Sequence, residues 1–184
     1  PQDGSVLRWT PLDDEYFGEG MTVVGDSLIQ LTWLAGKAFV YDIESFEVIG
    51  SFDYEGQGWG LCFDGVRLVM SDGSSSLTMR DPETFTVVDS VPVRLDGSSV
   101  ASLNELECVN GKVYANIWQT ETIVEINPST GDVTAVIDAS GLLDDADRAG
   151  ADVLNGIAYD AASGAFLLTG KLWPSMFVVV FEPS

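Results

Sequence analysis

The sequence contains no histidine, and it has only 8 lysines and arginines against 29 aspartates and glutamates. The lack of histidine excludes Ser-His-Asp and Cys-His nucleophile pairs and the usual histidine-containing zinc sites. The net charge of −21 argues against nucleic-acid and anionic-membrane partners, because both bind cationic surfaces. Apolar runs stay shorter than the roughly 18 residues that a membrane-spanning helix requires, and no segment reads as a targeting signal.

Cysteine is also scarce, with Cys62 and Cys108 as the two examples. Both stand inside apolar runs of neighbouring segments, which favours buried free thiols over a disulfide. Because the disulfide remains the alternative, cysteine usage indicates no compartment. The 184 residues, 46% of them hydrophobic, predict a single domain over residues 1–184 with a substantial core.

A unit of loop, strand, tight turn and strand recurs four times along the chain. The copies begin at Glu19-Gly20, Trp59-Gly60, Asn104-Glu105 and Asn155-Gly156. Asp64-Gly65 and Asn110-Gly111 are typical of type I′ hairpin turns, whose two central residues both need positive φ. The second strands are expected at Leu28–Leu31, Arg67–Met70, Val113–Ala115 and Phe166–Leu168. The third strands are expected at Ala38–Asp42, Leu77–Asp81, Ile123–Asn127 and Met176–Phe181.

A fourth strand completes the first three copies, as at Phe85–Ser90 and Asp132–Ile137. Four antiparallel strands in about 40–45 residues are typical of a β-propeller blade. Val6–Pro11 reads as a lone fourth strand, and the last copy stops after its third strand. The sequence therefore predicts an all-β, five-bladed β-propeller that lacks most of its first blade in this chain, with a β-sandwich of unrelated hairpins as the alternative.

One segment interrupts the strand pattern. Ser140–Leu154 has apolar residues at helix-compatible spacing, between the third and fourth copies. We expect a short helix or an ordered loop there, at the rim of the site described next.

Two equivalent positions in each copy carry side chains whose chemical type differs from one copy to the next. In a propeller, the connection into the innermost strand and the far end of the second strand lie on one face, so these positions should converge around one mouth. The predicted set is Glu19, Trp59, Asn104 and Asn155 with Trp33, Asp72, Trp118 and Lys171, and Phe17 lies two residues before Glu19. Taken one by one, these residues have ordinary alternatives as inter-blade packing and turn caps.

The predicted set has the composition of a small-ligand pocket, an aromatic wall with a few polar groups. Indole and amide N–H groups can hold a carbonyl oxygen on which charge develops. A carboxylate beside tryptophan faces is expected to have a raised pKa, which suits it to proton transfer near neutral pH.

Several segments together resemble the plant- and bacterial-type glutaminyl cyclases, also called glutamine cyclotransferases or glutaminyl-peptide cyclotransferases. They are FGEG (17–20), QLTW (30–33), EGQGWGL (55–61), MSDGSSSL (70–77), LNELE (103–107), YANIWQT (114–120), ADVLNGIAYD (151–160) and TGKLWP (169–174). The resemblance implies a five-bladed propeller that converts the N-terminal glutamine of peptides to pyroglutamate and releases ammonia, without a metal. It also implies a secreted or extracytoplasmic protein.

Residue by residue, the resemblance implies a pocket formed by Phe17, Glu19, Trp33, Trp59, Asn104, Trp118 and Lys171. Asp72 and Asn155 are then expected as supporting residues. A family motif from the first blade, Phe-Thr-Gln-Gly, does not occur in this sequence. The expected partners are peptides or proteins with N-terminal glutamine, together with a complementing N-terminal segment.

The resulting hypothesis assigns proton transfer to Glu19 and oxyanion stabilisation to Asn104, Trp118 and Lys171. The rings of Phe17 and the other two tryptophans would fold the glutamine side chain back onto its own amine. No cofactor is required. The hypothesis allows a structural cation in the channel, although the sequence shows no site for one. The competing hypothesis is a non-catalytic propeller that binds a peptide or protein and is inactive through loss of the first blade.

Overall fold

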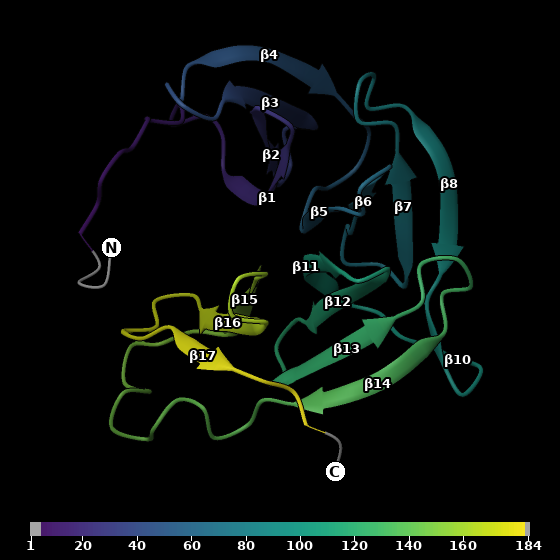
Figure 1. Cartoon of the computed structure of the whole chain (residues 1–184), viewed down its shortest axis with the longest axis vertical. Helices are drawn as coiled ribbons and strands as arrows, with labels where there is room; N and C mark the ends of the chain where they lie inside the picture. Colours follow the sequence, from purple (N-terminus) through teal and green to yellow (C-terminus); the bar gives the residue numbers. More distant parts are fainter. Residues whose placement is uncertain (1–4, 183–184) are drawn as a thin grey trace.

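Four antiparallel sheets stand around a common axis in the computed structural model, which describes residues 5–182 (Figure 1). Each sheet presents its first strand to the axis and its last strand to the outside. No helix occurs within residues 5–182, so the described part of the chain offers none that could cross a membrane. The ends of the predicted domain, residues 1–4 and 183–184, lie outside the described residues.

We number the sheets 1 to 4 in chain order. Sheet 1 comprises β1 (Gly18–Val24), β2 (Ser27–Thr32), β3 (Lys37–Asp42) and β4 (Val48–Asp53). Sheet 2 comprises β5 (Leu61–Phe63), β6 (Leu68–Met70), β7 (Ser76–Arg80) and β8 (Val87–Pro92). Sheet 3 comprises β11 (Leu103–Val109), β12 (Lys112–Ile117), β13 (Thr122–Ile126) and β14 (Val133–Asp138). Sheet 4 comprises β15 (Leu154–Asp160), β16 (Ala165–Gly170) and β17 (Phe177–Val179).

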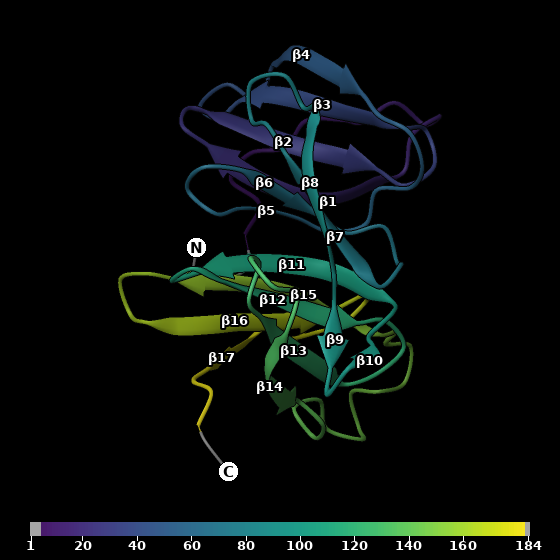
Figure 2. The same ribbon diagram turned by 90° about the vertical axis from the view of Figure 1, so that its right-hand side faces the viewer.

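This arrangement confirms the all-β propeller architecture and the four repeats, while the fifth blade stays a prediction. A short ribbon that the sequence did not indicate, β9 (Arg94–Leu95) with β10 (Ser98–Ser99), lies between sheets 2 and 3. It packs beside β14 through a parallel bridge between Arg94 and Asp132 (Figure 2).

The core lies between neighbouring sheets. Three clusters of buried apolar side chains fill the contacts of sheet 1 with sheet 2, of sheet 2 with sheet 3, and of sheet 3 with sheet 4. Leu31, Leu77 and Leu168 are examples, with at most 1% of their surface exposed, and burying such a side chain contributes about 1.5–3 kcal/mol. The outermost strands β4, β8 and β14 are mostly exposed, so the core is formed by the strands nearer the axis, which also carry the predicted site.

The prediction of a strand at Val6–Pro11 is wrong. These residues form no ladder, and Val6, Leu7 and Trp9 are each more than 70% exposed. A strand needs a partner for its backbone groups, and this segment instead contacts a turn of sheet 1, where Arg8 Nη1 donates to the carbonyl oxygens of Ile43 and Glu44.

The predicted turns form, but their types differ. Asn110 and Gly111 have φ values of 50° and 76° between the paired residues Val109 and Lys112, which confirms the type I′ turn. The Asp64 turn is a four-residue loop in which only Gly65 has positive φ, so the type I′ prediction is wrong there.

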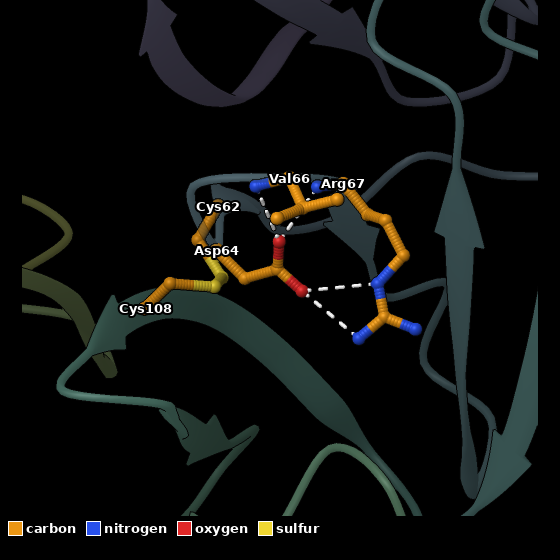
Figure 3. Close-up of a disulfide and its surroundings, with 5 residues drawn as sticks. All are labelled: Cys62, Asp64, Val66, Arg67 and Cys108. Carbon is orange, nitrogen blue, oxygen red and sulfur yellow. Dashed lines mark hydrogen bonds and ion pairs between the residues drawn. A yellow bond between two sulfur atoms is a disulfide. The ribbon is translucent and has the colours of Figure 1, made fainter.

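The Asp64 side chain organises that loop. Its Oδ1 accepts from the backbone N–H groups of Val66 and Arg67 at 2.9 and 2.6 Å, and its Oδ2 accepts from the Arg67 guanidinium at 3.0 and 3.1 Å (Figure 3). Burial raises the pKa of Asp64, but these hydrogen bonds outweigh it and hold the pKa below the ordinary value.

The segment Ser140–Leu154 is an ordered loop up to the start of β15, and the helical interpretation is wrong. Gly141 and Gly150 adopt left-handed φ values of 80° and 93° within it. Its final residues form hydrogen bonds outside the segment: Asp152 N donates to Lys171 O at 2.8 Å, and Lys171 N donates to Val153 O at 2.9 Å. The loop therefore braces the backbone of a predicted site residue.

The two cysteines form a disulfide, which corrects the free-thiol interpretation (Figure 3). Cys62 lies on β5 and Cys108 on β11, the inner strands of sheets 2 and 3. Inner strands of neighbouring sheets converge at the axis, and this brings the two Cα atoms within 5.4 Å, a distance that a disulfide can bridge.

Candidate active site

Each of the predicted positions on β1, β11 and β15 falls in a β-bulge. The regular pairing with the second strand is interrupted between Gly18 and Met21, between Leu103 and Leu106, and between Leu154 and Ile157. The interrupted residues include Glu19, Asn104 and Asn155. A bulge re-aims side chains out of the regular alternation, so the same local device turns a different functional group towards the axis in three of the sheets.

Glycines let the inner strands approach backbone to backbone beside these bulges. Gly20 N donates to Trp59 O at 2.8 Å, and a Cβ on Gly20 would lie 2.6 Å from Gly60 Cα. A Cβ on Gly60 would overlap the carbonyl oxygen of Asn104. The glycines that follow Glu19 and Trp59 are therefore required by packing.

The register corrects one predicted position. Met21 pairs with Gln30, Leu61 with Met70, Leu106 with Ala115 and Ile157 with Leu168. Three residues beyond those partners stand Trp33, Gly73, Trp118 and Lys171. Gly73, not Asp72, is therefore the equivalent residue in sheet 2, and a Cβ on Gly73 would lie 2.6 Å from the Trp59 ring.

Asp72 itself is exposed, and its Oδ1 accepts from Ser74 N at 3.0 Å. It lines a cavity of about 470 Å³ between sheets 1 and 2, together with Gln57 and Arg80. Its place next to Gly73 puts it at the edge of the site rather than in the ring of equivalent positions.

The aromatic residues form a continuous arc around the mouth. The Lys171 Nζ lies 5.8 Å from the centre of the Phe17 ring, and that ring lies edge-on to Trp33 at 6.1 Å. Gln57 Oε1 then joins the two indoles on either side of it, accepting from Trp33 Nε1 at 2.9 Å and from Trp59 Nε1 at 3.0 Å.

The arc ends on Trp118, whose ring packs edge-on against Trp59 at 5.4 Å. Trp118 Nε1 has no hydrogen-bond partner within residues 5–182, whereas both other indoles of the arc are occupied. Trp118 thus offers the free indole donor of the arc.

A carboxylate and an ammonium face each other at the start of the arc. Lys171 Nζ lies 3.8 Å from Glu19 Oε1, and the Glu19 side chain is only 13% exposed. Burial raises the pKa of Glu19 above its ordinary value, and the positive charge of Lys171 opposes this. A raised pKa is what the sequence predicted for this carboxylate. Its cause is burial as a whole rather than contact with a particular tryptophan ring.

Both side chains line a cavity of about 500 Å³ between sheets 1 and 4. Glu105 and Asn155 line it too, and Asn155 Oδ1 accepts from Glu105 N at 3.4 Å. The structure therefore brings together Phe17, Glu19 and Lys171 with the tryptophans of the arc, and it places Asn155 as a support for the bulge of the neighbouring sheet.

Glu105 and Glu107, on the inner strand β11, add two acids whose pKa values are raised. Burial, together with the negative charges of Glu107 and Glu19, raises the pKa of Glu105 to about 8. Burial also raises the pKa of Glu107 to about 7. Near neutral pH, Glu105 is therefore mostly uncharged, which leaves Glu19 as the carboxylate nearest to Lys171.

Two buried amides are unsatisfied. Asn104 Oδ1 and both side-chain polar atoms of Asn116 are buried without a hydrogen-bond partner within residues 5–182. The Asn104 backbone is fixed, because its carbonyl oxygen accepts from Ser71 Oγ at 2.6 Å. An unpaired buried polar group costs about 1–3 kcal/mol, and a hydrogen-bond donor bound at the axis could relieve this cost for Asn104, which lies on the inner strand β11.

Metal-ligand chemistry is limited here. No group of three or more Cys, Asp or Glu side chains within residues 5–182 is arranged to hold a metal ion. The structural cation that the sequence hypothesis allows in the channel is not tested by this structure.

Comparisons with known proteins identify the scaffold. A sequence profile of the family described as glutamine cyclotransferase matches residues 1–181. The chain belongs to this family. A curated glutaminyl-peptide cyclotransferase of Arabidopsis thaliana is 42% identical over 181 residues, which are 96% of this chain and 56% of the relative. The chain thus spans a little over half of the length of this relative.

Among solved structures, the glutaminyl cyclase of Myxococcus xanthus is similar, with 43% identity and a TM-score of 0.80 over 89% of this chain and 72% of that chain. The computationally designed Ika4 protein shares the fold alone, at 12% identity and a TM-score of 0.55 over 91% of this chain and 93% of that one. The family resemblance drawn from the motifs is confirmed.

Sequence reasoning missed Gln57 and Asn116. Both lie inside the motifs that carried the resemblance, EGQGWGL and YANIWQT. Gln57 stands between two glycines, in a loop where an amide side chain has no evident role in turn formation or core packing. That isolated polar side chain, two residues before Trp59, could have indicated a functional residue. Asn116 is a polar residue in an otherwise apolar strand run, and its complete burial follows only from the packing of sheet 3.

Proposed function

We propose that this chain is a glutaminyl-peptide cyclotransferase, which converts N-terminal glutamine of peptides or proteins to pyroglutamate with release of ammonia. The observation that carries the proposal is the Glu19–Lys171 pair, which lies beside Phe17 at the start of the aromatic arc. Family membership supports it, since the relatives are named for this reaction.

In this reaction the α-amine of the glutamine attacks its own γ-carbonyl carbon. A C–N bond forms, the bond to the amide nitrogen breaks, and that nitrogen leaves as ammonia. The chemistry is intramolecular, so holding the side chain folded supplies much of the rate, on the order of several kcal/mol of barrier. The rings of Phe17, Trp33 and Trp59 form the wall that favours this folded shape.

Glu19 has the protonation behaviour that the proton transfers need. As a carboxylate of raised pKa it accepts the proton lost by the attacking amine and returns it to the departing nitrogen. Lys171 beside it keeps the ionised form accessible and offers an N–H to the oxyanion.

Trp118 and Asn104 complete the proposed oxyanion contacts. The Trp118 indole N–H is free to donate, whereas the indole N–H groups of Trp33 and Trp59 both donate to Gln57 Oε1. This division supports Trp118 as a hydrogen-bond donor to the substrate and the other two indoles as walls. Asn104 is buried at the axis with an unpaired amide oxygen, and its amide nitrogen is a further donor.

The test is to incubate the purified chain with a glutamine-initiated peptide and to follow ammonia release and loss of the free N-terminus. Both are expected, and neither is expected from a peptide initiated by asparagine. Tight peptide binding without ammonia release would favour the non-catalytic alternative.

We also propose that the flank between sheets 1 and 4 receives a further polypeptide segment. Met21 and Val23 of β1, Met176 just before β17 and Val178 within β17 are each about half or more exposed. Met21 and Met176 line the cavity that holds Glu19. Such exposed apolar groups favour a protein partner. A chimera carrying the part of the Myxococcus xanthus enzyme that this chain does not match should bind less of the apolar dye ANS, and unchanged dye binding would contradict the proposal.

The disulfide supports an extracytoplasmic or secreted location, because disulfides persist in oxidising compartments. Expression with and without export, followed by thiol titration of the folded protein, tests this proposal. Free thiols in the exported protein would contradict it.

A further inference from the structure

Gln57 occupies the middle of the aromatic arc and has a fixed orientation. It lies in the loop between β4 and β5, and its Oε1 accepts from both Trp33 Nε1 and Trp59 Nε1. Indole nitrogen can only donate, so the oxygen end of the carboxamide must face the two rings. The NH₂ end is therefore directed away from the rings.

The NH₂ group of Gln57 has no hydrogen-bond partner among residues 5–182, and the residue is exposed. The space beside it is the cavity of about 470 Å³ that it shares with Asp72 and Arg80. Two N–H donors are thus held at the edge of the tryptophan wall, next to open space large enough for peptide groups.

A bound N-terminal glutamine has one polar group that the proposed mechanism leaves unpaired. Its α-amine faces Glu19, and its γ-carbonyl faces Trp118, Lys171 and Asn104. The α-carbonyl oxygen remains, and it is an acceptor on the part of the substrate that leads out of the pocket.

We propose that Gln57 is a substrate-binding residue whose NH₂ group donates to the α-carbonyl oxygen of the N-terminal glutaminyl residue, while its oxygen holds the Trp33 and Trp59 rings in place. This rests on the proposed function and adds the group that would recognise the peptide backbone. It also gives the rest of the peptide a direction, over Gln57 towards the cavity between sheets 1 and 2.

Two variants separate the two ends of the carboxamide. Gln57→Glu is nearly isosteric, keeps an oxygen for both indoles and removes the NH₂ donors. Gln57→Met removes the donor and the acceptor together. Gln119→Glu is the matched control, because it adds the same charge directly after Trp118 on an exposed side chain, and the Trp33 and Trp59 indoles donate to Gln57 instead.

Two substrates complete the experiment. Glutamine amide has the α-carbonyl, and 4-aminopentanamide has a methyl group in place of the whole α-carboxamide, so it can cyclise in the same way but offers no acceptor at that position. For glutamine amide, Gln57→Glu is expected to raise KM about tenfold, the effect of one hydrogen bond, with kcat within about twofold of wild type. For 4-aminopentanamide, wild type and Gln57→Glu should have the same KM, and Gln119→Glu should match wild type for both compounds.

Gln57→Met is expected to lower kcat as well, because the rings lose their common acceptor. A Gln57→Glu protein with wild-type KM for glutamine amide would overturn the inference and leave Gln57 as a ring-positioning residue. An equal rise in KM for both compounds would overturn it too. A wild-type chain that releases ammonia from neither compound contradicts the proposed function, and the inference falls with it.

Discussion

Lys171 Nζ and Glu19 Oε1 lie 3.8 Å apart, although their residues come from the fourth and the first sheet of the ring. The pair therefore spans the two ends of the arc of sheets, at the cavity that separates them. Because the Glu19 side chain is 13% exposed and Lys171 is 39% exposed, the carboxyl group is the more deeply buried partner of the pair.

Removing the Lys171 charge should shift the pH dependence of the reaction. Burial raises the pKa of Glu19 and Lys171 lowers it, so Lys171→Met leaves the raising effect unopposed. The acid limb of kcat/KM, where Glu19 becomes protonated, should move to higher pH, and kcat should fall about tenfold or more through loss of a charged oxyanion contact. A pH–rate profile measures both, and an unmoved acid limb would show that Glu19 is not the titrating group.

Glu105 should make the fold less stable as the pH rises. Its pKa of about 8 in the folded chain lies above the value of 4.5 expected when unfolded, so the folded state binds more protons between these limits. The contribution is fully present below about pH 4.5 and is lost as the pH rises through 8. Urea unfolding at several pH values should show this decline.

The variant Glu105→Gln should flatten the decline and be more stable than wild type at pH 8 by about 1 kcal/mol or more. Glu55→Gln is a suitable control, because Glu55 is exposed on a loop. Parallel stability profiles for wild type and Glu105→Gln would contradict the assignment.

The disulfide should contribute substantially to stability. Cys62 and Cys108 close a loop with a sequence separation of 46 residues, and a loop of this length corresponds to about 4 kcal/mol in the chain-entropy description. Reductant should lower the free energy of unfolding by about 2–4 kcal/mol. The Cys62→Ala/Cys108→Ala protein should be equally destabilised and insensitive to reductant, and a reductant effect on that double variant would discount the disulfide as the cause.

Two neighbouring residues in the loop between β6 and β7 should differ in how much their substitution destabilises the fold. Gly73 has a φ of 82°, and a Cβ there would meet the Trp59 ring, so Gly73→Ala should cost about 2 kcal/mol and displace the arc. Asp72→Asn should stay near wild type in stability, since Asp72 is exposed and caps only its own turn. Thermal unfolding compares the two, and a greater loss for Asp72→Asn would reverse the register argument.

Much of the ring could be predicted because the repeats encode it locally. Turn residues and short apolar runs place the strands within a few residues, and the spacing of 14 from Glu19 to Trp33 recurs from Asn104 to Trp118. In sheet 2 the same spacing leads from Trp59 to Gly73. Glycine has no functional side chain, so the sequence prediction took its neighbour Asp72 instead. The error was one residue of register.

The other features that the sequence did not predict correctly depend on contacts between separate segments of the chain. Whether Cys62 meets Cys108 follows from how closely the inner strands converge, which no single repeat specifies. The task of Gln57 depends on two indoles that come from different sheets. Val6–Pro11 has strand-like composition, but composition cannot supply the partner strand that a ladder needs.

Glu19→Gln tests the central claim most directly. The substitution keeps the size of the side chain and its place beside Lys171 while removing the proton acceptor. With a glutamine-initiated peptide, the wild-type chain should release ammonia, and Glu19→Gln should reduce kcat by at least about 100-fold, within the range of general acid–base catalysis. Ammonia release at the wild-type rate by the folded Glu19→Gln protein would contradict the account.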